Sequence, residues 1–221
     1  MNQVTADAGI PAPPSRTPRR GGRPGVRRTP RMAGRGQAAP GYRQPRCRTP
    51  RLRGGPAAAA HLAPEPRLVQ GFCADPVFHI DGLWTGEELG PWRASRYVNT
   101  CVDFTQGEAL GSVEIDDPDL LSPLSEFTAR VARALGPEPW VFHLEAFVGT
   151  SADGSPSIQF LEAGYRVGGA EIPFVWREVH GIDLARAAAD VQLGRRPELP
   201  YRMNGVRGWL LVPSPVPAPA A

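Results

Sequence analysis

The segment that most constrains the fold is residues 140–169, WVFHLEAFVGTSADGSPSIQFLEAGYRVGG, in which two strand-like runs flank Asp153-Gly154. An Asp-Gly pair favours a tight hairpin turn, because glycine adopts a positive φ without steric cost. We therefore expect two antiparallel strands paired symmetrically about this dipeptide. In that register Glu145 lies opposite Glu162, Phe147 opposite Phe160, and His143 opposite Gly164.

One face of this hairpin carries both glutamates, and like charges placed directly opposite destabilise a strand pair. A divalent cation between the carboxylates removes that repulsion, and Mg²⁺ is often held by one or two carboxylates plus substrate phosphates. The alternative is that Glu145 and Glu162 lie on a solvated face without a function. Pro156 in the second arm favours a turn wider than two residues. The other face is predicted to be core, with Phe142, Leu144 and Ala146 against Tyr165, Ala163 and Leu161.

Charge is divided sharply along the 221 residues. Residues 1–66 carry 13 arginines against two acidic residues, whereas residues 67–221 carry 12 arginines against 20 acidic residues. The first segment is rich in Arg, Pro, Gly and Ala, and such a composition buries too little apolar surface to offset the entropy of ordering. We expect a disordered arm over 1–66, a folded domain over 67–212 and a Pro/Ala-rich tail over 213–221.

The basic arm has two interpretations. Its arginines can neutralise nucleic-acid phosphates. The arm has almost no aromatic residues to stack on bases, so we do not expect nucleic acid as the main partner. The other interpretations are a solvated tail or a start codon assigned too far upstream.

The folded part has the pattern of an α+β domain. Apolar residues at 3.6-residue spacing predict a helix over 118–135, which Gly136-Pro137 ends. Its apolar face predicts packing on the sheet, which gives an antiparallel sheet with helices packed on one face. Further strands are expected at 68–69, 77–84, 93–98 and 209–212, and further helices at 173–180 and 184–193, the last capped by Asp183.

Two pairs of polar residues occur at strand spacing. His79 and Asp81 share one face of the strand 77–84, where a lone histidine is usually a structural residue. His143 and Glu145 share a face of the next hairpin and are suitable zinc ligands, but no third ligand occurs at a usual spacing. A zinc hydrolase is therefore not favoured.

The three cysteines, Cys47, Cys73 and Cys101, lack Cys-x-x-Cys spacing, which is typical of a reduced cytoplasmic protein. No apolar run approaches the ~18 residues that a membrane helix needs. The N-terminus lacks the apolar core of a secretory signal. We expect a cytoplasmic location and no membrane partner.

Four short motifs occur in a fixed order: FHIDGLW (78–84), VFHLEAF (141–147), FLEAGYRVGG (160–169), and GIDL (181–184) followed by QLG (192–194). In order and spacing this set resembles the C-terminal lobe of the ATP-grasp superfamily, which includes biotin carboxylase and D-alanine–D-alanine ligase. The resemblance covers about residues 67–212. It implies an ATP- and Mg²⁺-dependent carboxylate–amine (or thiol) ligase that works through an acyl phosphate.

The resemblance also assigns roles to particular residues. Glu145 and Glu162 match the two acidic positions that hold Mg²⁺ against the ATP phosphates. Arg166 matches the arginine after the second ligand and is the expected catalytic residue, because its fixed fork of donors suits phosphate or acyl-phosphate oxygens. The alternative for Arg166 is an ion pair with Glu162. Gln70 stands where the family's ribose-binding acid is expected, and its amide can still bind the ribose of ATP.

The chain departs from the family at several points. Gly164 stands where many members carry Asn, which removes one oxygen ligand. The chain has no lysine, so the nucleotide-binding lysines have no counterpart, and neither do the N-terminal domain and its glycine-rich loop. We interpret the chain as a C-terminal part of an ATP-grasp ligase that acts on a nucleotide and a small carboxylate substrate together with a missing N-terminal lobe or as a homo-oligomer. The alternative is a non-catalytic remnant of the fold.

Overall fold

The structure, a computed structural model, describes residues 8–13, 15–16, 69–200 and 205–214. Residues 17–66 of the predicted arm, and the predicted tail from 215 onward, lie outside this part. The chain divides into a unit over 14–71 and a second unit that comprises 1–13 and 72–221. In the first unit, β1 (Ser15–Arg16) pairs antiparallel with β2 (Val69–Gln70). All other elements belong to the second unit.

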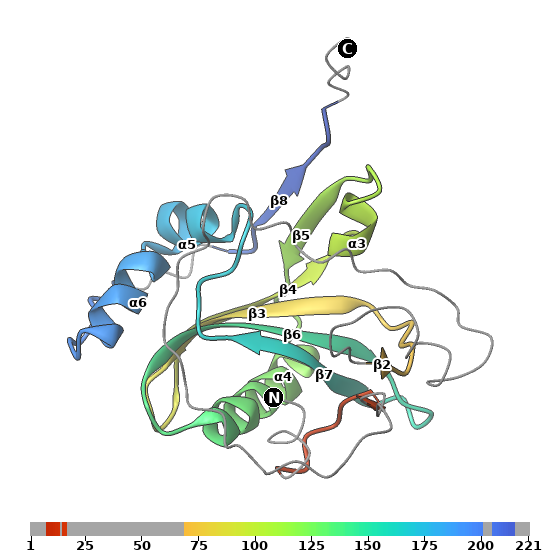
Figure 1. Cartoon of the computed structure of the whole chain (residues 1–221), viewed down its shortest axis with the longest axis horizontal. Coiled ribbons are helices and arrows are strands. Elements are labelled where there is room, and N and C mark those ends of the chain that lie inside the picture. Colours follow the sequence, from red (N-terminus) through yellow and green to blue (C-terminus); the bar gives the residue numbers. More distant parts are fainter. Residues whose placement is uncertain (1–7, 14, 17–68, 201–204, 215–221) are drawn as a thin grey trace, which may run out of the picture. The chain divides into compact units, whose positions relative to one another are not determined.

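The second unit is built on one six-stranded antiparallel sheet with the strand order β7-β6-β3-β4-β5-β8 (Figure 1). β3 and β4 lie at its centre, and seven of the eight residues of β3 are buried, as expected for a strand covered on both faces. The strands are β3 (Val77–Trp84), β4 (Leu89–Tyr97), β5 (Leu110–Glu114), β6 (Trp140–Thr150), β7 (Pro156–Gly164) and β8 (Gly208–Leu211).

Helix α4 (Pro118–Leu135) covers one face of the sheet with the bounds that the sequence predicts (Figure 1). The side chain of Asp117 caps its first turn by accepting from the amide of Asp119 at 3.0 Å. Its buried apolar stripe joins the side chains of β3, β6 and β7 in the larger core. That core includes Phe78, Ile80, Trp84, Leu124, Phe127, Val131, Phe142, Leu144 and Phe160.

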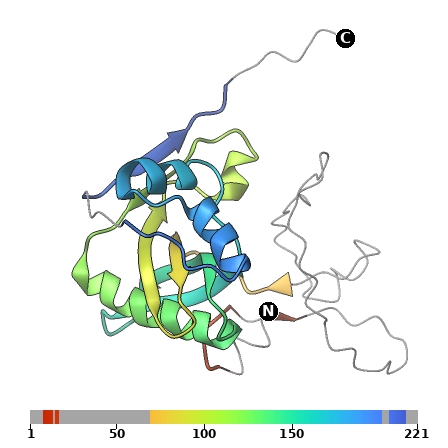
Figure 2. The same cartoon turned by 90° about the vertical axis from the view of Figure 1, so that its left-hand side faces the viewer.

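Helices α5 (Ile172–His180) and α6 (Leu184–Gln192) pack against the other face (Figures 1 and 2). A second apolar cluster joins them to the sheet through Leu83 of β3 and Val141 of β6. The α+β class and the antiparallel sheet with packed helices are confirmed, and the structure adds that helices lie on both faces. This second face also carries the polar side chains of β3 and β6.

The hairpin of β6 and β7 keeps the predicted register near the glutamates and changes it beyond them. His143 pairs with Gly164, and Glu145 pairs with Glu162, as predicted. A bulge follows at Leu161, so Ala146 pairs with Phe160, and the prediction of Phe147 opposite Phe160 is wrong. The extra residue lets Phe160 and Ala163 both face the core, although an uninterrupted strand would place them on opposite faces.

Two other features of the hairpin differ from the prediction. The connection spans five residues, because Thr150 pairs with Pro156. This wider loop agrees with the expected effect of the proline. Tyr165, predicted in the core, is 44% exposed and stacks on the ring of Trp140 at a centroid distance of 3.9 Å.

Residues 8–13 are ordered in the second unit, unlike the disordered arm expected over 1–66. Ile10 is 4% exposed and belongs to the larger core. The carbonyl of Pro11 accepts a hydrogen bond from the amide of Phe160 at 2.7 Å, and Arg130 donates to the carbonyl of Gly9 at 2.9 Å. This short stretch therefore has the apolar anchor and the backbone partner that the Arg-rich composition does not suggest.

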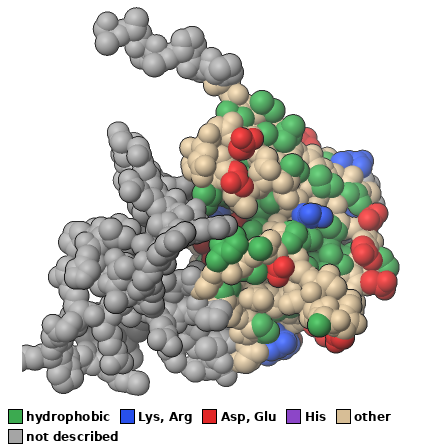
Figure 3. Space-filling model, turned by 90° about the vertical axis from the view of Figure 1, so that its right-hand side faces the viewer, with side chains coloured by type: hydrophobic (Ala, Val, Ile, Leu, Met, Phe, Trp, Pro, Cys, Tyr) green, Lys and Arg blue, Asp and Glu red, His purple; other side chains and the backbone are tan. Residues whose placement is uncertain are grey.

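Two elements of the second unit were not predicted. α3 (Cys101–Phe104) is four residues long and shows no periodicity, although its Thr100–Asp103 capping box is readable in the sequence. β5 forms part of the sheet between β4 and β8. In the part of the chain that the structure describes, no helix is long and apolar enough to cross a membrane. On the face shown in Figure 3, the few arginine side chains lie apart among acidic and apolar ones.

Candidate functional site

Glu145 is the more buried of the two predicted metal ligands, with a side chain that is 14% exposed. The hydroxyl of Tyr97 donates to its Oε1 at 3.0 Å, and Nε2 of His143 lies 3.5 Å from the same oxygen. Burial alone would raise the pKa of Glu145, but the contacts with His143 and Tyr97 lower it. These contacts at Oε1 therefore hold Glu145 as an anion.

Glu162 lies directly opposite on β7 and has a 56% exposed side chain. Burial and the charges of Glu145 and Glu162 raise the pKa of the Cys101 thiol. The strand register brings the two predicted ligands together on one face of the sheet.

Arg166 lies beside Glu162, with its Nη2 atom 3.9 Å from Oε1. Both side chains are more than half exposed, so the ion pair contributes little to stability. A Cβ at Gly164 would lie 3.1 Å from Cγ of Arg166. The arginine side chain thus occupies the space beside position 164, where the ATP-grasp pattern often carries Asn.

Gln70 cannot be placed in this arrangement. Gln70 is the last residue of β2 in the first unit, and its side chain lies outside the described part of the structure. Its role in binding ribose stays a prediction from the resemblance.

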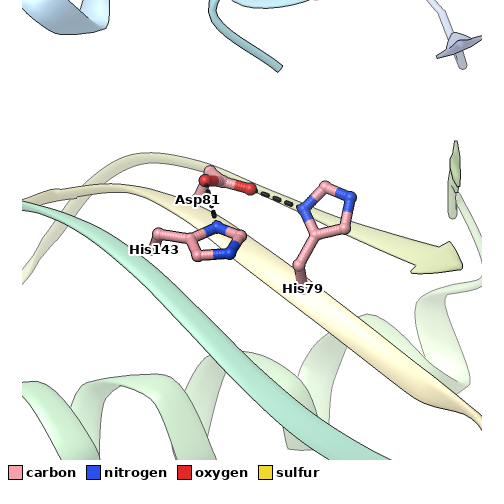
Figure 4. Close-up of side chains that lie close together, drawn as sticks. All are labelled: His79, Asp81 and His143. Carbon is pink, nitrogen blue, oxygen red and sulfur yellow. Dashed lines mark hydrogen bonds and ion pairs between the residues drawn. The ribbon is translucent and has the colours of Figure 1, made fainter. Parts of the chain in front are cut away.

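The structure also brings together a buried cluster that the sequence analysis did not assemble: His79, Asp81 and His143 (Figure 4). Asp81 contacts both histidines, with Nδ1 of His79 2.6 Å from Oδ2 and Nδ1 of His143 2.8 Å from Oδ1. All three residues are at most 3% exposed. Period-two alternation in β3 predicted that His79 and Asp81 share a face, and the third residue joins because β6 pairs with β3, where His143 lies opposite Asp81.

The outer nitrogens of both histidines have partners as well. Nε2 of His79 lies 2.8 Å from Oγ of Ser112, and Nε2 of His143 faces Glu145. A Cβ at Gly168 would lie 2.6 Å from Oδ1 of Asp81, so the backbone after β7 closes directly over the cluster. This network links the interior of the sheet to the predicted metal ligand.

Electrostatics favour an ion pair inside the cluster. Burial alone would raise the pKa of Asp81, but the neighbouring His143 and His79 hold it well below its usual range. Burial alone would lower the pKa of His143, but the carboxylate of Asp81 raises it to about 9. Asp81 is therefore ionised and His143 protonated at neutral pH in the metal-free protein.

A cavity in the described part of the chain lies elsewhere. It has a volume of about 250 Å³ and is found beside α6. None of the predicted site residues lines it. Its lining consists of Glu138, Pro139, Trp140, Val141, Tyr165, Ala188, Val191 and Gln192.

No protein-family model matches the sequence, and no curated protein matches it. Solved structures do match. One is the ADP complex of purK, an N5-carboxyaminoimidazole ribonucleotide synthetase, with a TM-score of 0.58, 12% identity and coverage of 94% of this chain and 53% of that one. Another is an L-amino acid ligase from Bacillus licheniformis, with a TM-score of 0.52, 18% identity and coverage of 85% and 44%.

A Rhizobium etli pyruvate carboxylase is also similar, with a TM-score of 0.53, 15% identity and coverage of 93% of this chain and 20% of that one. The chain thus spans about half the length of the first two proteins and a fifth of the third. These similarities bear out the resemblance found in the motifs: the chain has the fold of part of an ATP-grasp enzyme. At these identities the likeness establishes the fold, and the chemistry has to be argued from the residues.

Proposed function

We propose that this chain binds ATP with Mg²⁺ and supplies the metal-binding hairpin of an ATP-dependent carboxylate–amine (or thiol) ligase that works through an acyl phosphate. The observation that carries the proposal is the register of β6 and β7, which sets Glu145 directly opposite Glu162. The positively charged side chain of Arg166 lies beside this pair, with its Nη2 atom 3.9 Å from Oε1 of Glu162. The fold similarity to ATP-grasp enzymes, one of them an ADP complex, supports the nucleotide.

The donor chemistry at the hairpin fits Mg²⁺. This ion prefers oxygen ligands and is usually held by one or two carboxylates, with waters and substrate phosphates completing its shell. Both contacts to Glu145 go to Oε1, so Oε2 remains for a cation. Glu162 is exposed and can turn toward the same point. When bound, the ion would neutralise charge on the phosphate oxygens.

Arg166 is the proposed catalytic residue. The chain contains no lysine, so contacts to phosphate must come from arginine, hydroxyl groups or backbone amides. A guanidinium group binds phosphate through two parallel N–H donors, which fixes orientation as well as charge. Arg166 is 54% exposed, and within the described part of the chain it engages Glu162 and the neighbouring carbonyl of Val167, so it can reach a ligand without breaking a buried contact.

The proposed partners follow from the same resemblance. They are a nucleotide, a small carboxylate substrate, and either an N-terminal lobe or a second copy of the chain to complete the pocket. We also propose a cytoplasmic location, since Cys73 and Cys101 are both free.

The test is a thermal-shift titration of the full chain with ATP, with and without Mg²⁺. A ligand that binds only the folded state stabilises it by about 2.7 kcal/mol at ~100 times its Kd, which raises the Tm by roughly 5–11 °C. We expect a rise that depends on Mg²⁺ and is lost in both Glu145→Gln and Glu162→Gln. Glu178→Gln on α5 is the matched control, because this glutamate is exposed and pairs only with Arg177.

Arg166→Ala should weaken the ATP response while leaving the Tm without ATP unchanged. The absence of any shift at millimolar Mg²⁺-ATP would contradict the proposal and favour the non-catalytic remnant. An equal shift in Glu162→Gln would show that nucleotide binding does not use the hairpin.

A further inference from the structure

We propose that His79, Asp81 and His143 form a second metal site, specific for a first-row divalent cation such as Zn²⁺ and distinct from the carboxylate pair. Each residue offers one ligand atom, and these atoms all lie within 4.8 Å of one another (Figure 4). The inference does not depend on nucleotide binding.

The ligand types select the metal. Two imidazole nitrogens with one carboxylate suit Zn²⁺ and its neighbours in the first row, whereas Mg²⁺ takes oxygen ligands. Glu145 and Glu162 offer oxygen only, so the two proposed sites should prefer different ions.

The spacing requires little movement. A tetrahedral Zn²⁺ at about 2.0–2.1 Å from each ligand needs ligand atoms about 3.3 Å apart. The Nδ1 atoms of His79 and His143 lie 2.6 and 2.8 Å from the oxygens of Asp81. These two contacts use different oxygens of Asp81, and the three ligand atoms lie within 4.8 Å of one another, so the longest separation must shorten by up to about 1.5 Å to hold the ion.

The surroundings match those of a metal-binding histidine pair. Such histidines nearly always donate from their second nitrogen to an oxygen acceptor, which fixes the ring and its tautomer. Here Nε2 of His79 faces Ser112 at 2.8 Å, and Nε2 of His143 faces Glu145 at 3.5 Å. Both rings thus point Nδ1 at the shared carboxylate and Nε2 at an acceptor.

Gly168 makes room beside the ligand atoms. A Cβ at this position would lie 2.6 Å from Oδ1 of Asp81 and 3.0 Å from Nδ1 of His143. The absence of a side chain at Gly168 therefore lets the backbone approach two of the three ligands closely.

The first experiment uses the full chain with ¹⁵N-labelled histidine, stripped with a chelator and titrated with ZnCl₂. We expect one equivalent to bind, with the Nδ1 resonances of His79 and His143 moving to metal-bound values. His180, whose Nε2 lies 2.6 Å from Glu114, is the internal control and should not move. This readout needs no variant, so a misfolded mutant cannot obscure it.

Variants then test the assignment by competition with a chelator. Ser112→Ala should lower the Zn²⁺ affinity about 10-fold or more while the fold is kept, because it removes only the outer partner of His79. Glu162→Gln should leave the affinity unchanged. A variant with Ser at Cys47, Cys73 and Cys101 should also bind normally, which excludes thiolate ligands.

Three results would overturn the inference. The first is no stoichiometric Zn²⁺ binding. The second is binding without movement of the two Nδ1 resonances. The third is an affinity that falls in the cysteine-free variant and not in Ser112→Ala.

Discussion

Replacing Gly168 by alanine should destabilise the chain, whereas the same change at the adjacent Gly169 should not. Neither glycine has a positive φ, so backbone strain does not distinguish them. At Gly168 the new Cβ would lie 2.6 Å from Oδ1 of Asp81, 2.7 Å from Cδ1 of Ile172 and 3.0 Å from Nδ1 of His143. At Gly169 no atom lies within 4 Å.

The magnitude follows from which neighbours can move. The end of the Ile172 side chain can rotate away, but Asp81 is buried and held by both histidines. Overpacking of this kind costs about 1–3 kcal/mol, and weakening a hydrogen bond to a charged group adds about 1 kcal/mol. We expect a loss of about 2 kcal/mol or more, which lowers the Tm by roughly 4–8 °C in a domain of this size.

The assay is urea unfolding of the two variants and the parent, followed by fluorescence and far-UV circular dichroism at pH 7 with a chelator present. Gly169→Ala should stay within about 0.5 kcal/mol of the parent, or gain slightly by restricting the unfolded chain. A neutral Gly168→Ala would mean that the segment after β7 does not close over Asp81. Equal losses at both positions would mean that loop flexibility, and not the close contact, is responsible.

Three further predictions concern single contacts. Burial favours the neutral ring of His143, but the carboxylate of Asp81 raises the pKa of His143 from 6.5 to about 9. Protonation of His143 therefore stabilises the folded state by on the order of 3 kcal/mol. This stabilisation is present below pH 6.5 and is lost as the pH rises through 9. Urea unfolding of the chelator-treated chain at pH 6.5 and 9.5 should therefore show lower stability at the higher pH, and an unchanged value would refute this. Asp183→Ala should cost about 1 kcal/mol in thermal unfolding, because its side chain accepts a hydrogen bond from the amide of Arg186, in the first turn of α6, at 2.9 Å. Tyr97→Phe should cost about 1.5–3 kcal/mol in chemical unfolding, because the Tyr97 hydroxyl donates a hydrogen bond to the ionised Glu145. Tyr165→Phe is the control. It loses a hydrogen bond to the backbone carbonyl of Leu135 at the surface and should cost about 0.5–1.5 kcal/mol.

Local patterns predicted most of the elements, because their signals are carried within a few residues. Helix α4 has its apolar period, its cap and its stop within residues 117–137, and the structure keeps the predicted bounds of 118–135. The pairing of Glu145 with Glu162 was readable as well, because a hairpin is closed by its own turn. The bulge at Leu161 could not be predicted from the sequence, because it turns Phe160 and Ala163 toward core residues that are far away in the chain.

In the candidate site, too, the local features could be predicted from the sequence and the long-range contacts could not. The two glutamates and Arg166 lie on one hairpin and were found by spacing and resemblance. The buried cluster needs β6 to pair with β3 rather than with a strand nearer in the chain, and it brings together residues 62 positions apart. In the sequence His79 has the pattern of a structural histidine, and the zinc interpretation of His143 lacked a third ligand. Tertiary pairing, and not any local motif, supplies Asp81 as the missing partner.

The two proposed sites are physically joined at one side chain. His143 contacts Asp81 through Nδ1 and Glu145 through Nε2, so the group bound at Nδ1 determines whether Nε2 carries the proton that faces Glu145. Protonated His143 donates from both nitrogens, and metal-bound His143 still donates from Nε2. Glu145 therefore keeps the same partner in either state. Zn²⁺ in the buried cluster and Mg²⁺-ATP at the hairpin should then bind without excluding each other, because the shared histidine presents the same donor to Glu145 in both cases.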